Sequence, residues 1–189
     1  MAAREEYRAV VPATYDEVLV EVAQRAEKSG SLGKADIGAL VVWKRLRADT
    51  GWVSELMATP EAKVRAVTTR AVAAARDVSL RRGEAAQQGR EALWELPGFQ
   101  HGAALASAVL TAAAPARMAV YDRRAQQGLE HLGFSLGPVR GRYGRYMDLL
   151  DHLLAHGGPG TEGWRAREVD TALYWLGNRP QDHGSGAVR

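Results

Sequence analysis

The chain has 189 residues, of which 46% are hydrophobic and 25% charged, with a formal net charge of +3 and no cysteine. This composition is typical of a folded protein with a sizeable core. The lack of cysteine excludes a disulfide framework, a thiolate zinc site, an iron–sulfur cluster and a cysteine nucleophile. No apolar run suits a signal peptide or approaches the ~20 residues of a membrane span, so we expect a cytoplasmic protein without membrane contact.

Positive charge is concentrated in two segments of the chain. Residues 63–90 carry seven basic and two acidic side chains, and residues 117–145 carry six arginines against two acidic residues. Together these segments hold a net charge of +9, while the remainder sums to −6. Arginine supplies 21 of the 25 basic residues and suits bidentate phosphate contacts, although a genome of biased base composition would also favour it. The pattern favours contact with nucleic acid.

The first half of the chain predicts helices and no strands. Thr14 and Glu17 have the spacing of a capping box, and Thr59 followed by Pro60 is a typical helix start. Together with the apolar periodicity, these signals predict helices over residues 15–28, 34 to about 49, 52–57 and 60–76.

The second half also reads as helical, with helices predicted over residues 84–94, 146–156 and 164–176, and two more that follow Gly102 and begin at Asp122. Gly133 is a natural stop for the last of these. The segment before residue 146 is rich in glycine and arginine and is predicted to be a loop. We therefore expect an all-α bundle of about nine or ten helices over residues 1–178, either one compact unit or two helical lobes, and a flexible C-terminal tail over residues 179–189.

A Leu-Pro-Gly turn at residues 96–98 lies near the middle of the chain. Proline ends a helix and glycine permits the dihedrals that reverse the chain, so we predict a hairpin over residues 96–105. The amides exposed at the start of its second helix can hold a phosphate oxygen. Gln100 and His101 lengthen the turn by two residues relative to a Leu-Pro-Gly-apolar-Gly turn.

Residues 91–132 resemble the helix-hairpin-helix DNA glycosylase superfamily, whose members excise oxidised, alkylated and mismatched bases. In that family a hairpin of this type is followed by a small-residue helix and, about twenty residues past its second glycine, by an aspartate that starts the next helix. In this chain Gly102 and Asp122 are 20 residues apart. The context AVYDRR resembles the family segment around that aspartate. The likeness extends more loosely to the helix around Trp43 and to the closing pattern WRAREVDTALYW.

The resemblance implies a role for Asp122 in catalysis. In the family this carboxylate helps water to attack the sugar and stabilises positive charge on the sugar as the base leaves. Alternatively, Asp122 acts only as the N-cap of its helix. Bifunctional members carry a Schiff-base lysine where Ala104 stands here, so the resemblance implies a monofunctional N-glycosylase, if an enzyme, with no cofactor.

Several other residues are candidates for contact with DNA. The expected backbone contacts come from the hairpin and from nearby arginines: Gly98, Gln100, His101, Gly102, Arg123, Arg124, Arg142 and Arg145. Aromatic residues that could line a pocket for an extruded base are Trp43, Trp94, Tyr121 and Tyr143, although tryptophans at helical spacing more often belong to a core. Asp148, Asp151, His152 and His156 share a helical face, which we interpret as solvated rather than as a metal site.

Three functions remain open from the sequence. The first is a DNA-binding base-excision enzyme that uses Asp122. The second is a non-catalytic nucleic-acid-binding module, and the third is a helical protein-interaction scaffold. The first two predict salt-sensitive DNA binding, and the third predicts none.

Overall fold

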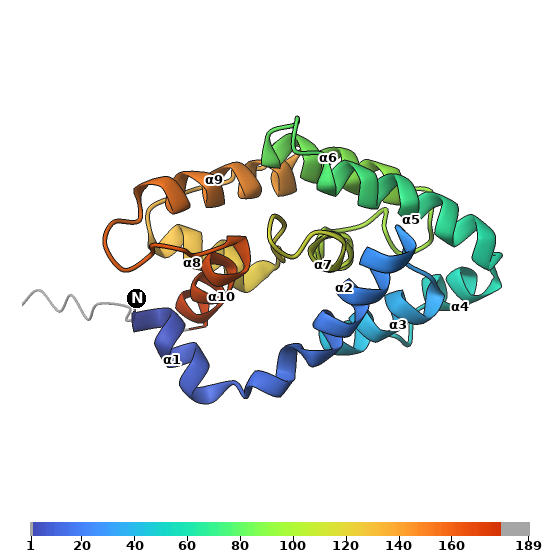
Figure 1. Cartoon of the computed structure of the whole chain (residues 1–189), viewed down its shortest axis with the longest axis horizontal. Helices are drawn as coiled ribbons and strands as arrows, with labels where there is room; N and C mark the ends of the chain where they lie inside the picture. The colour runs from blue at the N-terminus through green and yellow to red at the C-terminus, as the bar shows by residue number, and fades with distance from the viewer. Residues whose placement is uncertain (1, 179–189) are drawn as a thin grey trace, which may run out of the picture.

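The structure, a computed structural model, describes residues 2–178 and contains helices but no strand within that range. The all-α prediction is therefore confirmed, whereas the predicted tail over residues 179–189 lies outside the described residues. The helices, drawn in Figure 1, are α1 (Ala2–Val10), the 3-10 helix η1 (Ala13–Asp16), α2 (Glu17–Ser29), α3 (Lys34–Trp43), α4 (Gly51–Ala58), α5 (Glu61–Arg76), α6 (Arg82–Leu93), α7 (Ala104–Ala113), α8 (Arg123–His131), α9 (Arg142–His156) and α10 (Ala166–Gly177). None of these helices is long and apolar enough to cross a membrane.

Helix α7 is the central element of the fold. It packs against α2, α3, α5 and α6, and Figure 1 shows it in the middle of the molecule. Nine of its ten residues, from 105 to 113, are buried, as expected for a helix that is apolar on all sides. Its polar side chains have partners within the fold: the Ser107 hydroxyl accepts the Tyr121 amide at 3.0 Å, and the Thr111 hydroxyl donates to the Ser107 carbonyl at 2.7 Å. Ser107 therefore fixes the segment that leads to Asp122.

The predicted chain reversal between α6 and α7 is present. Gly98 and Gly102 both have positive φ, at 87° and 72°, which glycine adopts at little cost. The Gln100 side-chain amide donates to the carbonyls of Trp94 and Leu96, at 2.9 and 2.7 Å. Gln100 thus binds carbonyls of the turn that follows α6, which gives one of the two additional turn residues a structural role.

Helices α8 and α10 approach each other through two glycines. A Cβ atom placed on Gly128 would lie 2.1 Å from the Leu173 carbonyl oxygen, and one on Gly177 would lie 1.9 Å from the Arg124 carbonyl oxygen. Both distances are far below van der Waals contact. Glycine at these two positions is therefore required for the close packing that holds α10 against the helix that Asp122 begins.

Helix α9 begins four residues earlier than predicted, at Arg142 instead of 146. Gly141, with φ of 78°, starts it, and the Arg145 guanidinium binds the preceding loop through the carbonyls of Leu136, at 2.8 and 3.1 Å, and of Val139, at 2.7 Å. The arginine-rich segment is thus partly helical. Its tyrosines, Tyr143 and Tyr146, are fully buried.

The amino-terminal side differs from the sequence prediction in one missed helix and one wrong helix cap. Helix α1 was not predicted, because it contributes no buried residue and so lacks a strong apolar pattern. It is held by surface contacts, including an ion pair between Arg4 and Glu168 at 3.5 Å. Thr14 lies in η1 rather than in a capping box, and the N-cap of α2 is Asp16, without a side-chain cap bond.

The predicted start and end of two other helices also shifted. Helix α3 ends at Trp43, earlier than expected, because Arg45 takes a left-handed conformation with φ of 54°. The N-cap of α5 is Pro60 rather than Thr59, whose hydroxyl instead donates to the Glu55 carbonyl at 2.9 Å.

We expect Gly128→Ala to destabilise the protein by roughly 1–3 kcal/mol, because the new methyl group must displace backbone that packs closely. Gly38→Ala is the matched control. Gly38 is exposed on α3, and a Cβ added there would have no atom within 4 Å, so alanine should leave stability unchanged or raise it by up to about 1 kcal/mol. Urea unfolding of both variants measures the difference. Equal stabilities would contradict the packing of α8 on α10.

Candidate functional site

Asp122 is the N-cap residue of α8, as one of the two interpretations of the sequence predicts. Its Oδ1 accepts the Ala125 amide at 2.9 Å. Its Oδ2 accepts a hydrogen bond from the Lys44 ammonium, and the two side chains are only 17% and 16% exposed. The carboxylate therefore connects the start of α8 to the end of α3, across 78 positions in the sequence.

A pocket of about 500 Å³ lies around the Asp122–Lys44 pair, and we call it the Asp122 pocket. Its size is in the range of small-molecule sites. Four aromatic residues contribute to its wall, and Ala104, at the start of α7, lines it as well. The charged and aromatic residues around it are Tyr7, Tyr15, Trp43, Lys44, Arg45, Asp122, Arg123, Arg124, Arg167, Asp170 and Tyr174.

One wall of the Asp122 pocket is held by a buried polar network. The Arg167 guanidinium binds both Asp16 oxygens, at 3.1 and 3.3 Å, and also pairs with Asp170, which is 3% exposed. The Trp43 indole N–H donates to Asp16 at 3.1 Å, and Arg167 lies 5.3 Å from the Trp43 ring centroid. These contacts fix the orientation of Trp43, because its ring and its only donor both have partners.

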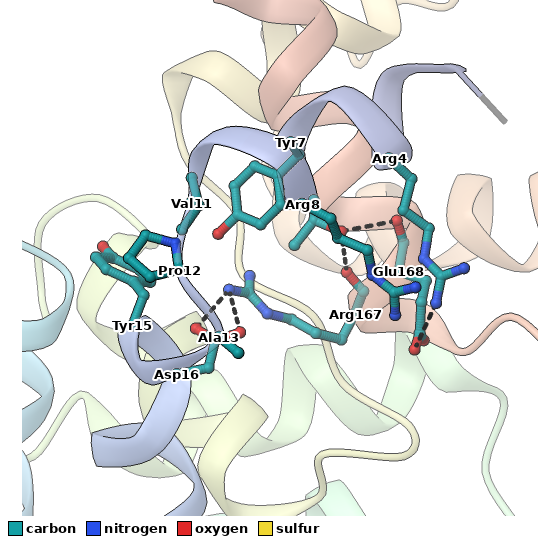
Figure 2. A pocket seen from close by; sticks show the side chains of 11 residues that line it. Arg4, Tyr7, Arg8, Val11, Pro12, Ala13, Tyr15, Asp16, Arg167 and Glu168 are labelled. Atoms are coloured by element: carbon teal, nitrogen blue, oxygen red, sulfur yellow. Dashed lines mark hydrogen bonds and ion pairs between the residues drawn. The ribbon is translucent and has the colours of Figure 1, made fainter.

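Burial raises the pKa of two residues that line the Asp122 pocket. Burial raises the pKa of Asp170, although Arg167 and Lys44 oppose the shift. Burial also raises the pKa of Tyr7 to about 12, so its hydroxyl stays protonated at neutral pH. Figure 2 shows Tyr7 beside Arg167 in an adjoining pocket of about 430 Å³, with the Arg167–Asp16 and Arg4–Glu168 ion pairs as dashed lines.

Lys44 is one of several residues of the Asp122 pocket that were not predicted from the sequence, as are Tyr7, Arg167 and Tyr174. The sequence drew attention to Ala104, where the resembling lyases carry lysine, but the structure brings Lys44 and Ala104 to the same pocket. Lys44 also lies 5.7 Å from the Tyr174 ring centroid. No local pattern marks this lysine, because it follows the last residue of α3 and its partner is distant in sequence. The Asp122 pocket thus contains an amine despite the alanine at 104.

Three of the four predicted base-pocket aromatics line a pocket other than the Asp122 pocket. Trp43 lines the Asp122 pocket, whereas Trp94, Tyr121 and Tyr143 line a second pocket of about 590 Å³. Trp94 is 41% exposed, but Tyr121 and Tyr143 are 8% and 1% exposed. The Tyr143 hydroxyl donates to the Ala119 carbonyl at 3.0 Å. These two tyrosines are thus primarily core residues.

The predicted DNA-contacting residues of the hairpin fall into distinct environments. Gly98 packs against the Trp52 ring, and Gln100 is engaged by the end of α6 as described above. His101 is exposed. Gly102 lines the second pocket, as does Gln100. The hairpin therefore offers Gly102 and His101 to a ligand more readily than Gly98.

The arginines that were predicted to contact DNA also lie in different environments. Arg123 and Arg124 are exposed and line the Asp122 pocket, and Arg142 lines the second pocket. The Arg145 guanidinium is occupied by loop carbonyls, so its donors are not available to a ligand.

On α9, Asp151 pairs with Arg82 at 3.0 Å, and the His152 and His156 rings stack with centroids 4.3 Å apart. No group of three or more potential metal ligands is found within residues 2–178.

We predict that Asp122→Ala destabilises the chain by about 1 kcal/mol more than Asp122→Asn does. Both changes remove the charge that pairs with Lys44, but only asparagine keeps an oxygen that can accept the Ala125 amide. Urea unfolding of the two variants measures the contribution of the cap alone. Equal stabilities would show that the cap bond adds nothing.

No family model, no curated protein and no solved structure was found that matches this chain. The function must therefore be inferred from the residues and from the geometry of the two pockets.

Proposed function

We propose that this protein binds DNA and accepts an extruded nucleotide in the Asp122 pocket, as a monofunctional N-glycosylase-like enzyme with Asp122 as its key carboxylate. One observation carries the proposal. The aspartate on which the resemblance to glycosylases rests lies in an aromatic-walled pocket of about 500 Å³, with Arg123 and Arg124 beside it.

The walls of the Asp122 pocket suit a flipped base. Enzymes that act on a base remove it from the stack and hold it between aromatic or apolar side chains. Tyr7 and Tyr174 supply such surfaces here, whereas Trp43 is only 5% exposed and is held in the wall by its contacts with Asp16 and Arg167. Arg123 and Arg124 form no ion pair with any residue in the described range, so both are available for backbone phosphates.

Asp122 is held in a position suited to charge stabilisation. Its bond to the Ala125 amide fixes the carboxylate at the start of α8, and an oxocarbenium-like transition state is stabilised by a nearby carboxylate. The bond between C1′ of the sugar and the base nitrogen breaks, and the base leaves with the electron pair. Water adds to C1′ and loses one proton, and the departing base takes up one proton, so that the products are the sugar hydroxyl and the neutral base. Lys44 must release Oδ2 for this step, because an ammonium partner offsets the negative charge that the sugar cation requires.

Excision from duplexes that each carry one damaged or mismatched base tests the enzymatic proposal. We expect base release from at least one duplex, and a loss of about 100-fold or more with Asp122→Asn. Asp49→Asn is the control, because Asp49 is exposed and pairs only with its neighbour Arg47, and it should retain full activity. The proposal fails if a broad panel shows no release although the duplexes are bound.

A non-catalytic nucleic-acid-binding module is the second candidate. The observation in its favour is that both Asp122 oxygens already have partners, Ala125 and Lys44. In that case the carboxylate has a structural role, and binding depends on the arginines alone. Asp122→Asn would then leave every measurable property of the DNA complex unchanged.

Both candidates predict salt-dependent duplex binding. We expect the double variant Arg123→Gln/Arg124→Gln to reduce the slope of log K against log salt by about 2, because each phosphate contact contributes a slope of roughly one. Fluorescence anisotropy of a labelled duplex at several salt concentrations measures this slope. The double variant Arg47→Gln/Arg65→Gln, at exposed positions outside both pockets, should leave it unchanged. An absence of affinity at low salt would exclude both candidates.

A further inference from the structure

The second pocket, of about 590 Å³, is lined in part by the hairpin residues Gln100, Gly102 and Ala103, and we call it the Trp94 pocket. Residues that are adjacent in sequence line different pockets. Gly102 and Ala103 line the Trp94 pocket, whereas Ala104 lines the Asp122 pocket. Tyr121 likewise lines the Trp94 pocket and Asp122 lines the Asp122 pocket. The Trp94 pocket is therefore a separate site with its own residues.

Positive charge exceeds negative charge around the Trp94 pocket. Arg90, Arg140 and Arg142 line it, and none of the three forms an ion pair with a residue in the described range, where many other arginines do. The pocket has a single acidic residue, Glu91, which accepts the Gln87 side-chain amide at 2.7 Å. Three guanidinium groups against one carboxylate favour an anionic ligand.

Two buried polar atoms of the Trp94 pocket lack partners. Arg90 Nε, a donor, and Gln87 Oε1, an acceptor, are both inaccessible to solvent and make no hydrogen bond within the described residues. The rest of the Arg90 guanidinium is placed by a 3.1 Å bond from Nη2 to the Gly102 carbonyl. Buried polar groups are normally hydrogen-bonded, so these two atoms make the wall of the pocket polar, although solvent does not reach them and a ligand would not contact them directly.

The same pocket also offers an aromatic surface. Trp94 is 41% exposed, and the Arg90 guanidinium lies 5.3 Å from its ring centroid. An exposed indole stacks on nucleobases irrespective of their identity, and a guanidinium adds to the stack. Arginines and an open aromatic ring at one site are the two features that a nucleoside phosphate requires.

We propose that the Trp94 pocket binds a nucleotide, with its phosphate held by Arg90, Arg140 and Arg142 and its base stacked on Trp94. The ligand is a nucleoside phosphate, present either as a free mononucleotide or as one residue of a single strand. This site does not depend on catalysis at Asp122.

Calorimetric titration of the full chain with dAMP, inorganic phosphate and deoxyadenosine tests the proposal. We expect dAMP to bind about tenfold more tightly than phosphate, because stacking adds to the phosphate contacts. Trp94→Ala should remove that advantage and leave phosphate binding intact, whereas Arg140→Gln/Arg142→Gln should weaken both ligands. Trp94 and Arg140 are exposed, and thermal unfolding of each variant confirms that it is folded. Arg47→Gln, outside the pocket, serves as the control.

Equal affinities for dAMP and phosphate would overturn the proposal, and so would dAMP binding that survives Trp94→Ala. Loss of dAMP binding in Arg123→Gln/Arg124→Gln would also overturn it, because that result would locate dAMP at the Asp122 pocket. Titration with the trinucleotide (dA)₃ distinguishes a site for a free mononucleotide from a site for one residue of a single strand. A strand-binding site holds (dA)₃ more tightly than dAMP, and a mononucleotide site does not. Asp122→Asn should leave dAMP binding unchanged. Failure of base excision with dAMP binding intact would therefore reject only the function proposed for Asp122.

Discussion

The Asp122 carboxylate joins two parts of the structure that are distant in sequence, and the candidate site depends on it. One oxygen caps α8 through Ala125, and the other receives the Lys44 ammonium at the end of α3. A pair that is more than four-fifths buried costs desolvation and is stable only when its hydrogen bonds are well made. The Asp122 pocket retains an ionisable acid and a primary amine in contact, an arrangement that a purely structural N-cap does not need.

Helix α7 determines where this pair lies. Because α7 is buried on all sides, its polar side chains bond to the backbone around them, and Ser107 holds the Tyr121 amide directly before Asp122. The segment that enters α7 contributes to both pockets, because Gly102 and Ala103 line the Trp94 pocket and Ala104 lines the Asp122 pocket.

The sequence predicted the elements that local physics determines. Apolar periodicity located most helices, Leu96-Pro97-Gly98 located the chain reversal, and Asp122 was recognised as a helix start from its position. Helix α1 was missed because its stability comes from surface contacts with α10 rather than from a buried face. The pairing of Lys44 with Asp122 could not be predicted, since long-range pairs leave no periodic pattern in a single sequence. Tyr143, expected at a base pocket, lies in the core because α9 begins earlier than its glycines suggested.

Fluorescence of 2-aminopurine placed next to a mismatched base in a duplex tests the central claim most directly, because this reporter becomes brighter when the neighbouring base on which it stacks is extruded. We expect a rise in fluorescence when the protein binds, and a much smaller rise with Ala104→Trp, which fills the Asp122 pocket without altering Arg123 or Arg124. Binding of the duplex with no change in 2-aminopurine fluorescence would contradict the assignment of the Asp122 pocket to an extruded nucleotide.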